Sequence, residues 1–553
     1  MKKSLRVLSL ALALLMTVSL LAACGGEKAP VETQKPVTSD TQPTTQAPTV
    51  TEAPTVTEAP TVTEAPTVTE APAVTEAPTV DKWKDVNFNG TEIVMNLNTW
   101  ESTNVVNAGA TNGIKYIQGP DEYTTDAVQN AVYDRNRKVT DKLGINIKYN
   151  HVEYPSVADT IPVVENYVLS DLEDSPDVLQ APGYVMIRAG VKGMLYNALA
   201  TNMEKNYFDI TEENGWYTDF MYENTLDESK LFLLAGDYFI DTLRFTYGVF
   251  VNIDMYNDVF SSEGGIETLY ETIEAGDWTY DELMRCADAA YVDAGTIGMV
   301  DEEDIFGVAA MDHFYYRNFF STSGLDIFEE KDGKIAYREE IGDIHTFVDK
   351  LLEMLLSHDS FLNCHKYSQN DYQATKLFTL GRTLFALDQY VLTLEGTQIH
   401  SMNQRVGIIP FPKYNKDVPY GALVADHANL GGILYNSDKF TECSALLQMM
   451  NEESNGGKGT VVYEYYEVAL KHKYSADAGQ IAMLDTIRRG ICSPKSFLLD
   501  NFFARNVGLS TYGDHMRKSA MAETNTFASD WASQLGAVQQ SLEDTYKIFG
   551  VQD

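Results

Sequence analysis

Hydrophobic and polar positions predict strands that alternate with helices from residue 92 onward. An apolar run at 92–97 follows the Asn89-Gly90 turn and is typical of a buried strand. Apolar residues at helical spacing then predict a helix that is closed by Gly144. Two further strands are predicted at 145–149 and 177–180, with a helical region to about residue 170 between them. This alternation favours parallel βαβ units and therefore an α/β fold.

The middle and the end of the chain continue this pattern less regularly. An aromatic stretch at 243–252 is predicted to be extended, and 383–387 resumes the buried-strand pattern. Thr279 is predicted to cap a helix, with Glu282 completing a capping box. Two prolines stiffen an extended segment at 406–412, and the C-terminal third is predicted to be mainly helical.

The first residues have the pattern of a bacterial export signal. A basic start is followed by an almost wholly apolar stretch up to Ala23, which is typical of a secretory leader. The sequence Leu21-Ala22-Ala23-Cys24-Gly25 resembles a lipoprotein processing site, which implies a diacylglycerol on Cys24. Two acyl chains anchor a protein stably where one is marginal. We expect cleavage after residue 23 and attachment to the extracellular face of the cell membrane; an ordinary leader with a chance cysteine is the alternative.

Residues 24–80 are predicted to form a tether that carries the lipid at Cys24 and has no folded core. Thr-Glu-Ala-Pro-Thr-Val recurs every six residues with almost no large apolar side chains. Such a composition buries too little surface to offset the entropy of ordering the chain. Proline-rich chains extend by roughly 3.1 Å per residue, so the tract could reach about 170 Å. Its threonines permit O-glycosylation without demonstrating it.

Composition excludes some functions for the region 81–553. The chain has 80 acidic and 41 basic residues and a net charge of −39. Because nucleic-acid surfaces need clustered lysine and arginine, nucleic acid is a poor partner. The region is too long for one hydrophobic core, which indicates two or more lobes.

Neither catalysis nor metal binding has a clear signature. The sequence contains no serine-hydrolase, zinc-protease, P-loop or dinucleotide-binding motif, so no catalytic residue, metal or cofactor is expected. Carboxylates are too numerous for any pair to indicate a glycosidase. Free buried thiols are favoured over two disulfides for the four cysteines of this region, which are Cys286, Cys364, Cys443 and Cys492.

Three segments resemble the extracellular solute-binding proteins of bacterial ABC importers, in the large family that includes sugar-binding members. The segment at 276–283, GDWTYDEL, resembles a helix entry of that family. The segments at 406–413 and 429–434 resemble the crossing between its lobes and the stretch after it. Their order behind a lipoprotein signal strengthens the resemblance.

The resemblance implies a two-lobed, periplasmic-binding-protein-like α/β fold of type II, with discontinuous lobes, a hinge and a ligand cleft between the lobes. We expect lobe 1 at about 85–240 and 375–410, and lobe 2 at about 241–374 and 411–553. The implied partners are a small solute, most simply a mono- or oligosaccharide, and the permease subunits of an ABC importer. The implied protein is not an enzyme.

The candidate ligand-binding residues are aromatic or charged side chains near predicted strand ends. Trp100 could stack on the C–H face of a sugar, or cap the core. Arg244 could bind a carboxylate, or pair with Asp241. Tyrosines can be structural, and single acids can be solvated or capping. The full set is Trp100, Glu101, Tyr184, Asp237, Tyr238, Arg244, Tyr247, Asp388 and Asp426.

Three functions remain open at the level of the sequence. The leading hypothesis is capture of an extracellular carbohydrate for import, although a peptide or another small solute is possible within the same class. The alternatives are a surface glycoside-processing enzyme and a polymer-binding surface lipoprotein. Ligand-induced stabilisation without product release would separate the first from the second.

Overall fold

The computed structural model describes residues 81–99, 113–152, 157–169, 175–296, 301, 303–310, 315–364, 373–391, 399, 402–471, 478–492 and 494–549. The predicted leader, Cys24 and the repeat tract lie outside these residues, as do Trp100 and Glu101. Val80–Asp553 forms one compact unit. Among the described helices, none has the length and apolar character needed to span a bilayer.

The first sheet has four strands in the order β12-β3-β1-β2. The strands are β1 (Thr91–Asn98), β2 (Ile145–Val152), β3 (Val178–Pro182) and β12 (Asn429–Ile433). β1 is parallel to β2 and β3, whereas β12 is antiparallel to β3. The helix α2 (Ala127–Leu143) connects β1 to β2; Asp126 caps its start and Gly144, at φ 60°, ends it in the left-handed region. The predicted βαβ arrangement is confirmed here.

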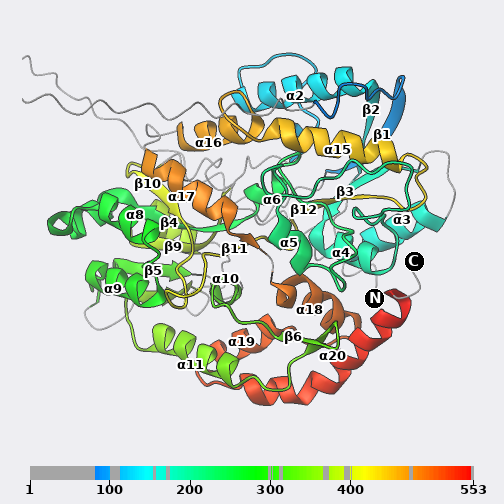
Figure 1. The fold of residues 1–553 in the computed structure, drawn as a ribbon. Coiled ribbons are helices and arrows are strands. Elements are labelled where there is room, and N and C mark those ends of the chain that lie inside the picture. The colour runs from blue at the N-terminus through cyan, green and yellow to red at the C-terminus, as the bar shows by residue number, and fades with distance from the viewer. Residues whose placement is uncertain are drawn as a thin grey trace, which may run out of the picture. The chain divides into compact units, whose positions relative to one another are not determined.

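The second sheet has five strands in the order β10-β4-β9-β5-β8. The strands are β4 (Tyr247–Asn252), β5 (Phe306–Ala310), β8 (Phe361–Asn363), β9 (Thr383–Tyr390) and β10 (Val406–Ile409). β5 is parallel to β8 and β9, and β4 is antiparallel to β9 and β10. Figure 1 shows the two sheets in different parts of the molecule, with helices around each. The α/β class and the assembly of each sheet from distant segments are therefore confirmed.

Helices pack against both sheets and form a third group near the C-terminus. Around the first sheet lie α3 (Val157–Leu169), α4 (Gly183–Val191), α15 (Phe440–Ser454) and α16 (Val461–Lys471). Around the second lie α7 (Ile253–Val259), α8 (Ile266–Glu274), α9 (Tyr280–Ala290), α13 (Gln373–Thr379) and α17 (Ala478–Arg489). The third group is α10 (Tyr315–Ser321), α11 (Gly342–Leu356), α18 (Lys495–Asn506), α19 (Tyr512–Met521) and α20 (Phe527–Phe549).

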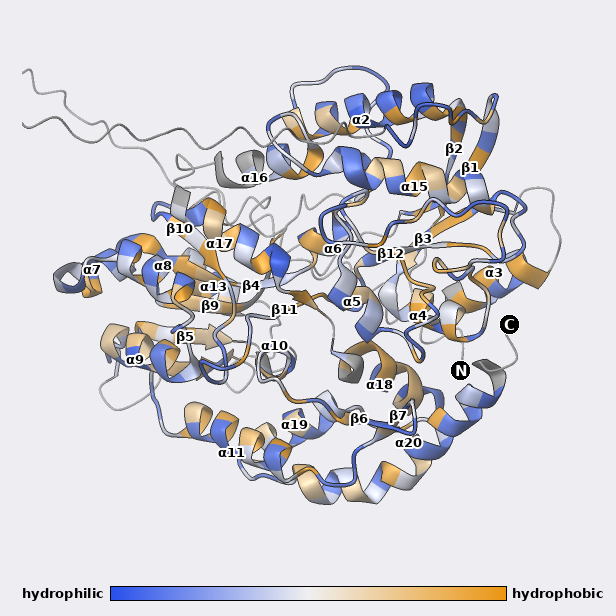
Figure 2. Cartoon of the chain, viewed as in Figure 1, coloured by the Kyte–Doolittle hydropathy of each residue, from blue (hydrophilic) through white to orange (hydrophobic). Residues whose placement is uncertain are grey.

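Short elements complete the fold. They are η1 (Gly113–Tyr116), α5 (Thr218–Glu223), α6 (Asp241–Arg244), η2 (Ser261–Glu263), the hairpin β6 (Phe328–Lys331) and β7 (Lys334–Tyr337), and the pair β11 (Ala422–Leu423) and β13 (Ile491–Cys492). Strands such as β3 and β4 are mainly hydrophobic, β2 and β6 carry many polar residues, and the helices alternate polar and apolar positions (Figure 2). This pattern fits helices that cover buried sheets.

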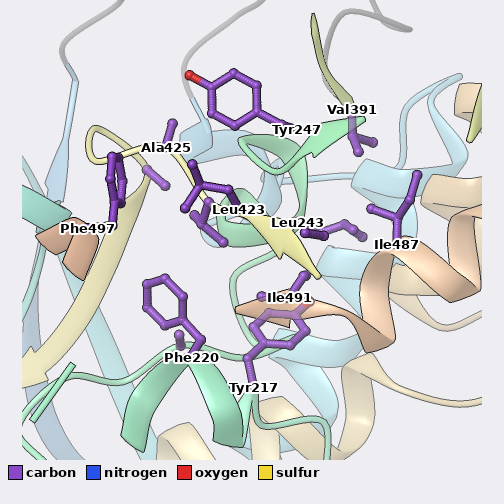
Figure 3. Close-up of a cluster of buried hydrophobic side chains, with 14 of the residues drawn as sticks. Tyr217, Phe220, Leu243, Tyr247, Val391, Leu423, Ala425, Ile487, Ile491 and Phe497 are labelled. Carbon is purple, nitrogen blue, oxygen red and sulfur yellow. The ribbon is translucent and has the colours of Figure 1, made fainter. Parts of the chain in front are cut away.

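Buried side chains from distant segments meet beside the pair β11 and β13. Leu423 and Ile491 come from this pair, Leu243 from α6 and Ile487 from α17, and all four are at most 3% exposed. Figure 3 draws them in one cluster with aromatic side chains from α5 and β4. The cluster is part of the main hydrophobic core. The cluster therefore packs the segments that lie between the two sheets against elements of both sheets.

Membership of the two sheets differs from the expected lobes. The range 375–410 was assigned to lobe 1, but its strands β9 and β10 are hydrogen bonded to β4 in the second sheet. The range 411–553 was assigned to lobe 2, but it supplies β12 to the first sheet. Both assignments are wrong for these strands, because a buried-strand pattern does not identify the neighbouring strand.

Two local predictions also need correction. The segment 243–252 is not extended throughout, because α6 includes Leu243 and Arg244 and the strand begins at Tyr247. Thr279 does cap α9, since its hydroxyl accepts from the backbone N–H of Glu282. The Glu282 carboxylate binds Arg285 at 2.8 Å instead of returning to the cap. The cap by Thr279 is therefore confirmed. Among the described residues, the Glu282 side chain makes no hydrogen bond to the Thr279 backbone N–H, so the predicted capping box is not complete.

Two of the resembling segments bind each other through what we call the Trp278 junction, formed by residues 278–280 and 410–413. The Trp278 indole is fully buried and donates to the Pro410 carbonyl at 3.0 Å. The backbone N–H of Tyr280 donates to the Lys413 carbonyl at 2.9 Å, and the N–H of Lys413 donates to the Trp278 carbonyl at 3.0 Å. This junction joins the start of α9 to the chain that follows β10.

The four cysteines in the described region are free thiols. Cys286, Cys364 and Cys443 are buried, and Cys492 is partly buried. Burial raises the pKa of Cys286 to about 12. The preference for free thiols over two disulfides is confirmed.

Candidate functional site

Arg244 belongs to a buried polar network rather than to an open surface. Its guanidinium is 1% exposed and binds the Asp241 carboxylate at 2.7 Å. Asp241 accepts from the Asn429 side chain at 2.7 Å, and Asn429 accepts from Asn98 at 2.8 Å. Burial raises the pKa of Asp241, and its bonds to Arg244 and Asn429 oppose that rise. The network fixes α6 against β12 and the end of β1, which matches the pairing alternative for Arg244.

Asp237 is likewise engaged with protein partners. Its carboxylate has no exposed surface, accepts from the Tyr217 hydroxyl at 2.7 Å and forms an ion pair with Arg488. Arg488 lies on α17, which packs against β10 of the second sheet. Asp237 follows the bridge between Leu234 and Gly431 of the first sheet. The ion pair therefore links the two sheets and is structural in this conformation.

Tyr238 is held on several sides. Its hydroxyl donates to the Leu234 carbonyl at 3.2 Å and accepts from Gln180 at 3.2 Å. A Cβ at Gly431 would stand 2.0 Å from that hydroxyl oxygen, so only glycine fits there. Burial raises the pKa of Tyr238. This tyrosine is a core residue with satisfied polar atoms.

Tyr247 and Asp388 lie on adjacent strands of the second sheet. Tyr247 begins β4 and is 3% exposed. Its hydroxyl points away from Leu243 and Leu423 in Figure 3. Asp388 lies in β9, and its side chain is outside the described part of the structure.

Tyr184 and Asp426 are brought together by backbone hydrogen bonds. Tyr184 is the second residue of α4, which begins directly after β3. Its N–H donates to the Asp426 carbonyl at 2.9 Å, and the Gly183 N–H donates to Ala428 at 2.9 Å. A Cβ at Gly183 would stand 3.0 Å from the Asp426 carbonyl oxygen. Glycine therefore lets the crossing between β11 and β12 approach the start of α4.

The Asp426 carboxylate is partly exposed, at 31%. His427 Nδ1 lies 3.3 Å from one carboxylate oxygen, and Asn501 reaches the other at 3.5 Å. Burial raises the pKa of Asp426, but the His427 contact and the charge of Arg317 outweigh it and hold that pKa below its usual value. Desolvation, followed by the charge of Asp426, raises the pKa of Tyr184 to about 12. A charged acceptor therefore stands beside a neutral phenol donor at neutral pH.

Arg317 adds a cation to this group. It lies on α10, with its guanidinium carbon 5.6 Å from the centre of the Phe497 ring. A Cβ at Gly513 would stand 2.8 Å from Arg317 Nε, so the absence of a side chain there makes room for the guanidinium. Burial lowers the pKa of Arg317, but Asp426 and neighbouring tyrosines more than offset this, and the pKa is raised.

We call this group the Asp426 cluster; its members are Tyr184, Phe245, Arg317, Asp426, His427, Phe497 and Asn501. The Phe245 ring meets the His427 ring edge-on at 5.0 Å. α4 follows the carboxyl end of β3, and α10 is the first described helix after the carboxyl end of β5. Both strands belong to parallel pairs, and ligands of open α/β sheets bind outside such ends. The cluster thus combines contributions from the edges of both sheets with the chain that crosses between them.

Sequence reasoning identified only Tyr184 and Asp426 in this cluster. His427 follows Asp426 directly in the sequence but is not among the predicted candidates. Arg317, Phe497 and Asn501 were missed, since each lies on a helix that no recognised motif marks. These residues lie on helices near strand ends, which is a feature of ligand sites. Recognising that feature requires the positions of β5 and α18, which the sequence alone does not give.

A separate cavity of about 360 Å³ lies at the β6–β7 hairpin. Its lining includes Asp227, Glu228, Asp326, Glu329 and Lys334. None of its lining residues belongs to the Asp426 cluster. In the described residues, no group of three or more histidine, cysteine or acidic side chains is placed to hold a metal ion.

Comparisons with known proteins give similar solved structures. No family model and no curated sequence matches the chain. A cyclo/maltodextrin-binding protein complexed with maltotetraose is similar, with a TM-score of 0.47, 14% identity, and coverage of 84% of this chain and 97% of that chain. The maltose-bound MalE3 of T. maritima has a TM-score of 0.45 and 13% identity, covering 81% of this chain and 99% of that one. The fold described above rests on its own hydrogen-bonded strands.

Proposed function

We propose that this protein captures an extracellular solute, most simply a mono- or oligosaccharide, and delivers it to an ABC importer. The observation that carries the proposal is the Asp426 cluster, where the carboxyl-end edges of both sheets contribute side chains to one place. Its members offer what a sugar needs: a carboxylate acceptor, a phenol donor and aromatic rings. Hydroxyl groups would bind the polar atoms while C–H faces cover a ring.

Binding at this position would couple to a movement of the sheets. A solute that touches α4 of the first sheet and α10 beside the second would favour the conformation in which both are near. A ligand shifts such an equilibrium only through its different affinity for the two states. The importer could then recognise the ligand-bound conformation. The binding-protein fold of type II and the hinge form part of this proposal.

Attachment of the protein to the membrane belongs to the same proposal. The leader and the residues around Cys24 support a lipid anchor, and the repeat tract supports a long tether. Tethering raises the effective concentration of the receptor near its permease without any new contact. The expected location is the extracellular face of the cell membrane.

Thermal unfolding of the full chain in detergent, with and without sugars, tests this function. The panel should include glucose, maltose, maltotetraose, cellobiose and xylobiose, with chromatography of the sugars afterwards. A ligand at 100 times its Kd adds about 2.7 kcal/mol, or roughly 3 °C for a domain of this size. A shift without new products supports a binding protein.

Released products would support the glycoside-processing alternative, and binding confined to long polymers would support the surface lipoprotein. No shift with any carbohydrate would refute the sugar assignment. Asp426→Asn should reduce a sugar-induced shift, because the amide loses charge-assisted acceptance. Asp141→Asn is the matched control, since that acid is 76% exposed on α2.

A further inference from the structure

Arg317 has hydrogen-bonding capacity that the protein does not use. Within the described residues its guanidinium forms no hydrogen bond and no ion pair within 4 Å; its contacts are the Phe497 ring and the close approach of Gly513. The side chain is partly exposed. Arg244 and Arg488 provide the contrast, because each is paired with a buried aspartate. An arginine held by packing with its N–H groups unpaired is suited to an external acceptor.

Asp426 does not pair directly with this arginine. Its carboxylate oxygens face His427 and Asn501, although its charge acts on Arg317 from a distance. The Tyr184 hydroxyl, like the guanidinium, makes no hydrogen bond to any described residue, and Tyr184 is partly exposed. Donors outnumber the remaining acceptors in the Asp426 cluster. A ligand for this place should therefore contribute acceptors.

The guanidinium selects among acceptors by shape and charge. Its planar set of N–H groups matches a carboxylate with two parallel hydrogen bonds, which are about twice as strong as neutral ones. A neutral hydroxyl pair could satisfy one or two N–H groups but would not form the pair of charge-assisted hydrogen bonds that a carboxylate offers. Phe497 restricts one face of the guanidinium, so an acceptor would approach its edge.

We infer that the Asp426 cluster binds an anionic carbohydrate, whose carboxylate or sulfate group lies against Arg317 and whose hydroxyls reach Asp426 and Tyr184. This inference rests on the proposed capture of a carbohydrate and adds the charge of that carbohydrate. The net charge of −39 does not oppose it strongly, because the Debye length at physiological salt is about 8 Å. Distant acids are screened at that range, so the charges that act on a ligand here are those of Arg317 and of the neighbouring Asp426 and Asp514; direct hydrogen bonds to the guanidinium favour the anion.

Isothermal titration of the full chain in detergent tests the inference with matched ligands. The ligands are trigalacturonate, the same trisaccharide with its carboxylates methyl-esterified, neocarrabiose 4-sulfate and maltotriose. We expect at least one anionic sugar to bind about 10-fold or more tightly than the ester and maltotriose. Trigalacturonate and neocarrabiose sulfate distinguish a carboxylate from a sulfate.

The variant Arg317→Gln isolates the role of the guanidinium. It should weaken anionic-sugar binding by about 10- to 100-fold, the range expected for a lost charged hydrogen bond. Arg317→Lys keeps the charge but not the bidentate geometry, so the affinity of this variant for the anionic sugar should lie between those of the unmodified protein and Arg317→Gln. Thermal unfolding without ligand checks that each variant is folded. Increasing salt should weaken binding of the anion and leave binding of a neutral sugar unchanged.

The outcomes separate this inference from the function on which it rests. If neutral sugars bind as tightly as anionic ones, or if Arg317→Gln weakens both equally, the inference is wrong and sugar capture stands. If none of the four ligands binds, and no neutral sugar of the wider panel shifts thermal unfolding, both the inference and the proposed capture of a carbohydrate are wrong. If anionic sugars bind and Arg317→Gln does not reduce their affinity, the charge is recognised elsewhere and the assignment to Arg317 is refuted.

Discussion

The Trp278 junction and the Asp426 cluster are both built from aromatic and polar groups on chain segments that cross between elements. At the junction, the indole N–H and the backbone groups of Tyr280 and Lys413 all have protein partners. In the cluster, the Arg317 guanidinium and the Tyr184 hydroxyl make no hydrogen bond to the described residues. One region is complete without a ligand, whereas the other offers free donors.

The residues that resemble the solute-binding family are therefore different from the residues that are suited to bind a ligand. The Trp278 junction contains two of the three family-like segments, and its role in the structure is to join them. The cluster lies outside those two segments, and Asp426 only precedes the third. A sequence motif can therefore mark the framework of a binding protein and say nothing about its ligand.

The largest expected effect is at Trp278. Trp278→Ala should lower the free energy of unfolding by about 3–5 kcal/mol, because it removes a fully buried side chain. Urea unfolding measures this loss. Trp278→Phe is the control, since it keeps most of the volume and loses the bond to Pro410. A stable Trp278→Ala variant that had lost sugar binding would reverse the distinction between the two regions.

The ion pair between Arg488 and Asp237 is a second contact whose polar groups are satisfied within the protein. Arg488→Met should cost about 3 kcal/mol, because it leaves the Asp237 carboxylate buried without its cation. The double variant Arg488→Met with Asp237→Leu should recover part of that loss, since no charge then remains buried. Urea unfolding of both variants gives the difference. Equal stability of the single and double variants would show that this ion pair does not hold the sheets together.

Asp500 is a buried acid without a directly bonded cation, and it predicts a pH dependence. Its carboxylate is fully buried and accepts from the Tyr337 hydroxyl at 2.9 Å and the Tyr512 N–H at 2.8 Å. Burial raises its pKa to about 7, against the hydrogen bonds and the charge of Arg505. The native protein therefore keeps a proton that the unfolded chain has released above about pH 4. Stability should fall as pH rises from 5 to 7, by roughly 2–3 kcal/mol from this group.

The variant Asp500→Asn tests that dependence. Its amide does not ionise, so the loss of stability between pH 5 and pH 7 should be smaller than in the unmodified protein. Urea unfolding at both pH values for both proteins isolates the contribution of this residue. If the free energy of unfolding changed equally between pH 5 and pH 7 in both proteins, the assignment of the proton to Asp500 would be contradicted.

The smallest expected effect is at Tyr184. Tyr184→Phe should weaken the binding of a sugar about 5-fold, as expected for one lost neutral hydrogen bond. Stability without ligand should change by less than about 0.5 kcal/mol, since the hydroxyl has no partner among the described residues. Titration with the best-bound sugar and thermal unfolding measure the two quantities. A loss of stability with unchanged affinity would place Tyr184 with the structural residues.

The sequence was informative where a pattern is local. It located the strands near 92–97, 145–149 and 177–180 and the cap at Thr279, because periodicity and capping depend on nearby residues. It placed the ranges that contain β9, β10 and β12 in the wrong lobes, because pairing between strands that are far apart in the sequence leaves no local signal. For the candidate site, it proposed Tyr184 and Asp426 but missed Arg317, whose importance depends on what is absent around it.

The position of β12 also determines when the first sheet can be completed. β3 ends at Pro182, yet its antiparallel neighbour is not synthesised until residues 429–433. The second sheet likewise waits for β10 at 406–409. Pairing over such separations slows folding, because loop closure must occur before those contacts form. During most of its synthesis, this chain has neither sheet complete, so its folding must be largely a late event that follows the appearance of the last strands.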